Sequence, residues 1–252
     1  MQHYWKCNES SGDLTDLVAG LDLVRTDTHV IGSDTYPAYG AAGPIAAFPS
    51  LTAVYSAGVG GGASTHDGVF SVAIPGTPDW TINGNPFTIE LWIWLDEYPA
   101  APGYAMQVGD GGSSVSFYLA GFGGTSLTSQ IDTDLFIDPN PFPLDTWQHI
   151  AITSDGATGK LYRGGVLVDS GAATDAPGSG TVNLLNQGGG SEDPWPGRTA
   201  HLAIYDCELT QTDLQEHIAN AASVPDVTAG YVWTADGTGG TSWEAPTIEV
   251  TY

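Results

Sequence analysis

The stretch that most restricts the fold is Phe87-Thr-Ile-Glu-Leu-Trp-Ile-Trp-Leu95. It alternates apolar and polar residues at first and then becomes wholly apolar, which is typical of a central strand whose outer face is also covered. Other short apolar runs recur through the first 206 residues, and the 34 Gly and 16 Pro supply the turns between them. The sequence therefore predicts an all-β fold, and 252 residues suffice for one large domain of this class.

A three-stranded meander is predicted between Trp147 and Asp169. Its short apolar runs are Trp147-Gln-His-Ile-Ala-Ile-Thr153, Lys160-Leu-Tyr-Arg163 and Val166-Leu-Val-Asp169. Gly164-Gly165 stands between the last two runs and can adopt the positive φ angles of a two-residue hairpin turn.

The only convincing helix is predicted from Gln211 to Asn220, after a strand at Arg198–Tyr205. Thr210 is placed as its N-cap, and Asp213 three residues on can complete an exchange like that of a capping box. Its apolar residues, Leu214 among them, share one face, so we expect the helix to lie against the strands as a lid.

The formal net charge of −24 comes from a shortage of cations, since the chain has only 5 Lys and Arg against 29 Asp and Glu. Such a surface repels duplex nucleic acid and anionic membranes, so neither is predicted as a partner. Two interpretations remain open: a protein that binds divalent cations or works in high salt, and a coat component that is soluble and does not stick. We favour the second.

Targeting and cysteine signals are sparse. The start Met1-Gln-His-Tyr-Trp-Lys6 lacks the pattern of a secretion signal, and no run of about 18 apolar residues occurs, so neither a signal nor a membrane span is predicted. Cys7 and Cys207 are the only cysteines, which excludes a disulfide framework and a metal cluster of the two-plus-two type.

The composition changes after Ala222, where Ser223-Val-Pro-Asp-Val227 cannot continue a helix, and we predict a module boundary there. Residues 230–246 resemble terminal segments of tailed-bacteriophage fibre and minor tail proteins. Thr247–Tyr252 alternates with one apolar face but is too short to be stable alone, so we expect it to pair with a strand of this chain or of a partner. Residues 223–252 are thus interpreted as an assembly segment that contacts other virion proteins and supports a homo-oligomer.

Several stretches together resemble the laminin-G-like, concanavalin A-like jelly roll, a two-sheet antiparallel sandwich. They are Tyr4–Gly12, Phe87–Trp94, Trp147–Asp169 and Gly197–Thr210. The resemblance spans about residues 4–222. It implies that the first and last strands lie side by side, which would bring Cys7 close to Cys207. A disulfide and two buried thiols are both consistent with that arrangement.

Catalysis is not predicted. Glycoside hydrolases with this jelly roll present two carboxylates on one face of a central strand, whereas Phe87–Leu95 offers Glu90 alone, with Asp96 and Glu97 only at its end. Asp132 and Asp134 have the right spacing but are interpreted as solvated turn residues. The six histidines show no metal-ligand spacing; His149 and His201 are interpreted as satisfied sheet residues.

The resemblance also implies candidate binding sites. Many members of the family bind Ca²⁺ at loops along one edge, and the candidate ligands here are Asp110, Asp132, Asp134 and Asp138, although solvated turns are the favoured interpretation. Carbohydrate sites combine aromatic rings with polar groups. The candidate rings are Tyr98, Tyr104 and Phe122 in the loop Gly121-Phe122-Gly123-Gly124, whereas Trp195 is interpreted as a core residue.

These observations together predict a non-enzymatic structural or adhesion protein on the virion surface of a tailed phage or related virus, released by lysis. Host-surface glycans are its expected ligands, bound by avidity through several weak sites. The alternatives are a free-standing carbohydrate-binding protein and, less favoured, a glycoside hydrolase that would depend on Glu90 or Asp96.

Overall fold

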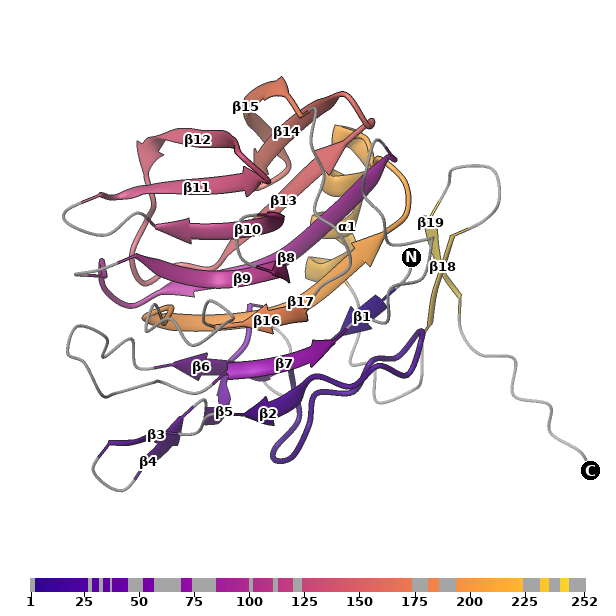
Figure 1. Cartoon of the computed structure of the whole chain (residues 1–252). Coiled ribbons are helices and arrows are strands. Elements are labelled where there is room, and N and C mark those ends of the chain that lie inside the picture. Colours follow the sequence, from indigo (N-terminus) through magenta and orange to yellow (C-terminus); the bar gives the residue numbers. More distant parts are fainter. Residues whose placement is uncertain are drawn as a thin grey trace, which may run out of the picture.

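In a computed structural model of the chain, two antiparallel sheets face each other and one helix lies behind them (Figure 1). The structure describes residues 3–26, 29–31, 34–36, 38–44, 52–56, 69–73, 85–99, 102–110, 113–119, 124–173, 181–185, 194–223, 232–235 and 241–244. The predicted two-sheet jelly-roll sandwich is confirmed.

The first sheet has eight strands and contains the strands predicted most clearly. In spatial order they are β15 (Val166–Ala172), β14 (Thr158–Arg163), β13 (Gln148–Ser154), β8 (Phe87–Leu95), β17 (Gly197–Tyr205), β6 (Thr52–Ser56) and β5 (Ala38–Ala42). The eighth strand, β1 (His3–Trp5), also pairs with β17. The predicted meander corresponds to β13, β14 and β15 and is confirmed, with φ angles of 59° and 71° at Gly164 and Gly165.

The second sheet has seven strands. In spatial order they are β12 (Asp134–Pro141), β11 (Ser126–Ile131), β10 (Ser113–Leu119), β9 (Gly103–Asp110), β16 (Thr181–Leu184), β7 (Val69–Ala73) and β2 (Val24–Thr26). Two small hairpins stand apart from both sheets: β3 (His29–Ile31) with β4 (Asp34–Tyr36), and β18 (Val232–Ala235) with β19 (Thr241–Glu244).

The core lies between the sheets, and β8 runs through the middle of one of them. Its alternate residues are buried in the core: Phe87, Ile89, Leu91, Ile93 and Leu95. Its intervening residues turn to the opposite, outer face of the sheet. Because β13 and β17 flank β8 and an outer helix covers part of it, both faces of this strand are packed, as its sequence predicted.

The helix α1 (Gln211–Ser223) covers the outer face of the eight-stranded sheet. The Thr210 backbone N–H donates to Asp213 Oδ2 at 2.7 Å, and the Asp213 N–H donates back to Thr210 Oγ1 at 3.3 Å, so the predicted cap is confirmed. Leu214 packs in a second apolar cluster with Ala151 and Ala203 of the sheet beneath it. Among the described residues, no helix has the length and apolar character that crossing a membrane requires.

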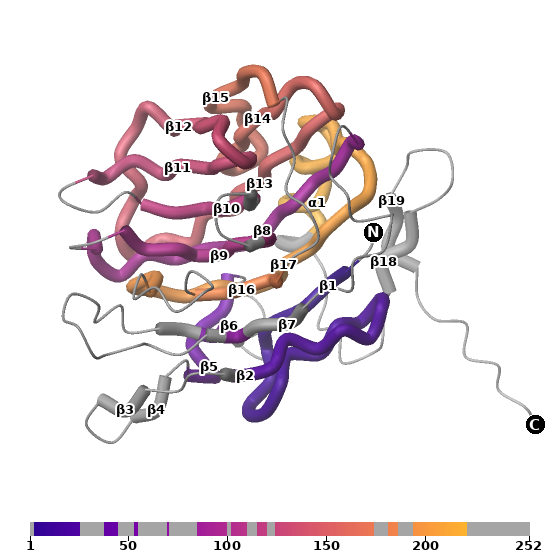
Figure 2. Tube along the Cα trace, in the orientation of Figure 1, coloured from indigo at the N-terminus to yellow at the C-terminus, as the bar shows by residue number. Residues whose placement is uncertain are grey.

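The two cysteines are free, which excludes the disulfide. The first and last strands of the sandwich, β1 and β17, do lie side by side, as the family resemblance implied (Figure 2). Tyr4 is opposite Ala203, and Trp5 is opposite Leu202. That register is antiparallel, so Cys7 faces the His201 region while Cys207 lies beyond the other end of the pair. At about 3.3 Å per residue along β17 the two are roughly 20–23 Å apart. Cys7 is buried and Cys207 is exposed.

The C-terminal segment contributes only one hairpin to the described structure, with Trp233 opposite Trp243. The predicted strand at residues 247–252 lies outside the described residues. The division into a module and an assembly segment stays a prediction.

Candidate functional site

Two tyrosines stack on the outer face of the seven-stranded sheet. Tyr118 lies between the core residues Phe117 and Leu119 on β10, so strand alternation turns its ring outward. Tyr104 of β9 is its cross-strand partner, and their ring centroids are 4.9 Å apart at an interplanar angle of 20°. Both rings are partly exposed. The structure therefore places the predicted Tyr104 beside a second aromatic ring that sequence reasoning missed.

A row of neutral polar side chains crosses the same face next to the tyrosines. The strand registers align Asn183 of β16, Gln107 of β9, Ser116 of β10 and Gln130 of β11. We call these four residues the amide row. Gln107, Ser116 and Asn183 are almost fully buried, whereas Gln130 is partly exposed. The row therefore forms a polar floor beside the two rings.

The chemistry of this face suits a neutral polar ligand. Amide and hydroxyl groups both donate and accept hydrogen bonds, as the hydroxyl groups of a sugar do. The Ser116 hydroxyl is buried and has no hydrogen-bond partner in the described part of the chain. Burial raises the pKa of Tyr118, so its phenol is neutral. Neither the amide row nor the tyrosine pair carries a charge at neutral pH.

The other predicted aromatic residues lie elsewhere. Tyr98 packs against the core, and its hydroxyl donates to the Phe142 carbonyl at 2.8 Å. Trp195 is fully buried and donates from Nε1 to the Trp94 carbonyl at 2.9 Å, so its interpretation as a core residue is confirmed. Phe122 lies outside the described residues. Of the two predicted sugar-binding rings that the structure describes, Tyr104 lies beside other candidate ligand groups and Tyr98 does not.

The predicted calcium ligands whose side chains are described, Asp132, Asp134 and Asp138, do not form a cluster of three. Asp132 occupies the turn between β11 and β12 with a φ of 52°, and Asp134 follows directly, opposite Ile131. Asp138 lies in the middle of β12, where its buried carboxylate pairs with Arg163 at 2.9 Å. The side chain of Asp110 is not described. Within the described residues no group of three or more acidic, His or Cys side chains could hold a metal ion, and the calcium site stays a prediction.

A cluster of ionisable side chains is buried beneath α1. We call Glu90, His149, Tyr205 and His217 the Glu90 cluster. The Glu90 carboxylate accepts hydrogen bonds from Tyr205 Oη and His217 Nδ1, both at 2.8 Å, and from His149 Nε2 at 3.1 Å. Because an ionised carboxylate only accepts, each of these imidazole nitrogens must carry its hydrogen. The four groups come from β8, β13, β17 and α1, so the cluster fastens the helix to the sheet.

The opposite charges of Glu90 and His217 stabilise the ionised form of each group. Burial by itself would raise the pKa of Glu90, but positive His217 and the hydrogen bonds from both histidines hold it well below its ordinary value. Burial by itself would lower the pKa of His217, but the Glu90 carboxylate raises it above the usual 6.5. Glu90 is therefore ionised near neutral pH, and His217 keeps its proton to a higher pH than an ordinary histidine does.

His149 and His201 lie in strands β13 and β17, as predicted, but each satisfies only one ring nitrogen: His149 Nδ1 and His201 Nε2 are buried without a hydrogen-bond partner in the described part of the chain. His149 donates to Glu90, as described, and its ring lies edge-on to Trp92. His201 Nδ1 lies 2.7 Å from the Tyr4 hydroxyl. Burial lowers the pKa of His201 to about 4, so this ring is neutral at physiological pH.

The acids named for a hydrolase are far apart and already engaged. Glu90 and Asp96 are six residues apart along β8, or roughly 20 Å, whereas glycosidase carboxylates lie about 5–10 Å apart. Asp96 is exposed beyond the strand, where it accepts a 2.8 Å hydrogen bond from Trp94 and pairs with Arg198 at 3.2 Å.

A family model described as the concanavalin A-like lectin/glucanase superfamily matches residues 67–215, which is more than half of the chain. No curated protein matches. Among solved structures, the sialidase of Trypanosoma rangeli in complex with a difluorinated sugar acid matches with a TM-score of 0.62 and 10% identity, over 88% of this chain and 32% of that one.

Two further solved structures are similar. The binding domain of Paraclostridial Mosquitocidal Protein 1 has a TM-score of 0.60 at 14% identity, over 86% of this chain and 51% of that one. Domain 4 of an extracellular arabinanase from Geobacillus stearothermophilus, in complex with arabinotriose, has a TM-score of 0.58 at 18% identity, over 85% and 96%. The chain spans about a third of the sialidase chains. At these identities the likeness concerns the fold.

Proposed function

The chain belongs to the concanavalin A-like lectin/glucanase superfamily, and from this premise we propose that it is a non-enzymatic protein that binds neutral glycans through the outer face of its seven-stranded sheet. The setting we propose is the surface of a tailed-phage virion, where several weak sites on one particle give tight attachment to a host.

The stacked pair Tyr104 and Tyr118, alongside the amide row, carries the proposal of glycan binding. Aromatic rings bind the apolar face of a pyranose, while amides and hydroxyls fix its hydroxyl groups. Similarity to domain 4 of the arabinanase, whose solved structure contains arabinotriose, gives independent support for a carbohydrate as ligand.

The state of the acidic residues supports a binding protein over a hydrolase. A hydrolase needs one carboxylic acid with a raised pKa and a second carboxylate nearby. Glu90 instead has a lowered pKa, both of its oxygens accept hydrogen bonds, and α1 covers it. The amide row contains no carboxylate.

Glycan binding can be tested on an array of neutral and acidic glycans, followed by calorimetry with the strongest ligand. We expect neutral glycans to bind and Tyr118→Ala to weaken binding about tenfold, since a stacked aromatic contact is worth on the order of 1 kcal/mol. Tyr118→Phe is the matched control, because it keeps the ring, and Tyr98→Phe should leave affinity unchanged. Undiminished binding by a folded Tyr118→Ala variant would exclude this face.

The virion setting rests on the resemblance of residues 230–246 to phage tail segments, and the oligomeric state tests it. Light scattering should show a closed oligomer for the full chain and a monomer for a version that ends at Ala222. A monomer in both cases would favour a free-standing lectin, the alternative that needs no assembly segment.

A further inference from the structure

Two partly exposed tryptophans form a corner on the opposite side of the sandwich, on the outer face of the eight-stranded sheet. Trp94 lies near the end of β8, and Trp147 directly precedes the residue of β13 that pairs with Ile93. Their ring centroids are 5.9 Å apart, and the ring planes meet at 65°. Trp94 is four residues from Glu90 along β8, or roughly 13 Å, so this corner lies beyond the buried Glu90 cluster.

Polar groups fix the Trp94 ring in place. Its Nε1 donates to Asp96 Oδ1 at 2.8 Å, and the guanidinium carbon of Arg198 lies 4.6 Å from its centroid. Arg198 Nη2 also donates to Asp96 Oδ1 at 3.2 Å. The ring is therefore oriented without a ligand, which lowers the entropy cost of binding one.

This arrangement retains groups that a ligand can use. The side chains of Asp96 and Arg198 are 38% and 26% exposed, and the other Asp96 oxygen, Oδ2, makes no hydrogen bond within the described part of the chain. Arg198 has five N–H donors, only one of which Asp96 Oδ1 uses. Exposed aromatic surface thus lies beside one free acceptor and several free donors.

The charges select the class of ligand. Asp96 and Arg198 compensate each other, so the corner itself is neutral, while the chain as a whole carries a formal charge of −24. An anionic sugar would gain little locally and would be repelled by the rest of the surface. A neutral pyranose can contact the exposed parts of the two indoles, the acceptor and the donors together, although Arg198 covers one face of Trp94.

We propose that Trp94, Trp147, Asp96 and Arg198 form a second binding site, specific for neutral pyranose oligosaccharides, on the face of the sandwich opposite the tyrosine pair. This inference goes beyond the proposed function and shares with it only the class of ligand. Two sites on opposite faces make a single chain bivalent. One molecule can then bridge two glycan chains without any oligomer.

The test is a titration of the full-length, isotope-labelled chain with cellohexaose, laminarihexaose and mannohexaose, up to about 5 mM, where a site with a millimolar Kd is mostly occupied. The indole N–H signals of Trp94 and Trp147 are assigned with single Trp→Phe variants. We expect at least one hexasaccharide to shift both signals. Trp147→Ala should weaken the affinity measured from the remaining indole shift about tenfold. Asp96→Ala, a second variant that alters only an exposed group, should do the same, while Tyr118→Ala should leave this affinity unchanged.

The outcomes separate the two sites. Shifts confined to the side-chain amides of Gln107, Gln130 and Asn183 would overturn the second site and leave the proposed function standing. Indole shifts that Tyr118→Ala also removes would mean one site only and would overturn it too. Unchanged indole signals with all three hexasaccharides would exclude the neutral pyranose site, whereas the glycan array decides the proposed function separately.

Discussion

The outer face of the eight-stranded sheet holds ionised groups under a helix, whereas the corresponding row on the seven-stranded sheet holds amides, hydroxyls and phenols. On the first face Glu90 is flanked in register by Ala151 and Ala203, and these small residues let α1 approach closely enough to bury the carboxylate. On the second face Gln107, Ser116 and Asn183 of the amide row are buried, and the Ser116 hydroxyl has no hydrogen-bond partner among the described residues.

The difference separates structural polar groups from candidate ligand groups. A buried charge is tolerated only when its partners satisfy it, and once satisfied it has no capacity left for a ligand. An unpaired buried hydroxyl such as that of Ser116 costs stability, and a ligand can relieve that cost. We therefore expect substitutions on the two faces to act on different properties, stability on one and binding on the other.

The largest effect is expected from Glu90→Ala. It leaves His149, Tyr205 and His217 buried without their common acceptor, and breaking a buried ion pair in this way costs about 3–5 kcal/mol of unfolding free energy. Urea unfolding followed by far-UV circular dichroism measures the loss. Glu90→Gln, which keeps an acceptor oxygen, should lose less. A cost below about 1 kcal/mol for Glu90→Ala would mean that the helix does not depend on this cluster.

The next comparison sets Tyr205→Phe against Ser116→Ala. Each removes one buried hydroxyl, but the Tyr205 hydroxyl donates to Glu90 and that of Ser116 has no partner. Tyr205→Phe should lower the unfolding free energy by about 1–3 kcal/mol, whereas Ser116→Ala, which removes an unpaired buried hydroxyl, should raise it by about 1 kcal/mol. Equal losses in thermal and urea unfolding would contradict the distinction between the two faces.

Much of the covered face could be predicted from sequence, since its signals are local. Thr210 and Asp213 define the cap, Gly164-Gly165 define the turn, and the alternation in Phe87–Leu95 indicates packing on both faces. α1 extends three residues beyond its predicted end at Asn220, because the sequence has no helix stop signal before Pro225.

The candidate site was harder to predict because strand pairing assembles it. Tyr104 was found as an aromatic residue of a loop-like stretch, but Tyr118 and the amide row depend on the registers of β9, β10, β11 and β16. The alternation in Ser113-Ser-Val-Ser-Phe-Tyr-Leu119 was the available signal, since it turns Ser116 and Tyr118 away from the core. No local pattern reveals which strands become neighbours.

Strand register also explains why the disulfide does not form and why the hydrogen-bond partners of Glu90 were not predicted. The resemblance implied the correct neighbours, β1 and β17, yet the cysteines are separated because the offset of an antiparallel pair is not encoded in either strand alone. Likewise His217 lies 127 residues from Glu90, so nothing in the helix sequence indicates its ion pair.

The third prediction concerns pH and tests whether His217 is charged in the folded protein. Its pKa is raised above 6.5, so its interaction with Glu90 is fully present below that pH and is lost as pH rises through the folded pKa. A double-mutant cycle with Glu90→Gln and His217→Gln should give a coupling free energy about 1 kcal/mol larger near pH 6.5 than near pH 9, since hydrogen bonds to charged groups are stronger.

The loss of stability at acidic pH comes from a pKa that is lowered in the folded protein rather than raised, and it provides the control. His201 has a pKa of about 4 in the folded protein, below its ordinary 6.5, so stability is lost as pH falls from about 6.5 towards 4, when the unfolded chain gains a proton that the buried ring resists. His201→Gln should remove that loss and leave the Glu90–His217 coupling unchanged. A coupling that is independent of pH would show that His217 is neutral.

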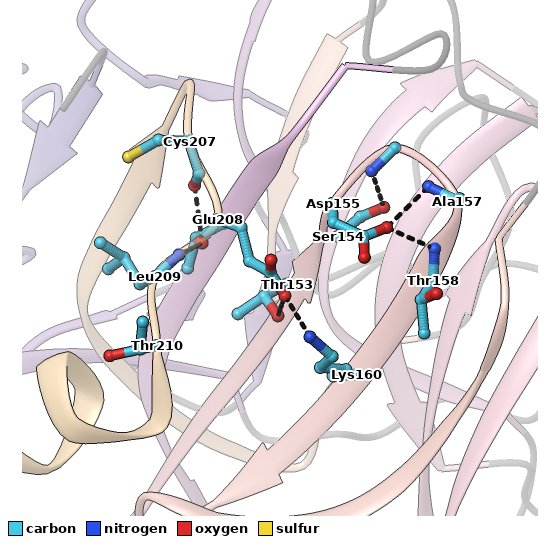
Figure 3. Close-up of polar contacts among 12 residues, drawn as sticks. Thr153, Ser154, Asp155, Ala157, Thr158, Lys160, Cys207, Glu208, Leu209 and Thr210 are labelled. Atoms are coloured by element: carbon cyan, nitrogen blue, oxygen red, sulfur yellow. Dashed lines mark hydrogen bonds and ion pairs between the residues drawn. The ribbon is translucent and has the colours of Figure 1, made fainter.

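The smallest effect is expected at Glu208, a second carboxylate on the covered face that pairs with a cation but stays partly exposed. Its Oε1 lies 2.6 Å from Lys160 Nζ, beside Thr153 and the chain segment that leads into α1 (Figure 3). Water and salt screen such a pair, so Glu208→Gln should cost about 0.5 kcal/mol or less, and nothing measurable at about 1 M salt. Urea unfolding at low and high salt, with Glu90→Gln as the salt-insensitive reference, measures both. A loss above about 2 kcal/mol that persists at high salt would mean that exposure does not set the strength of an ion pair on this face. The contrast between the ionised groups of this face and the uncharged groups of the other would then need another cause.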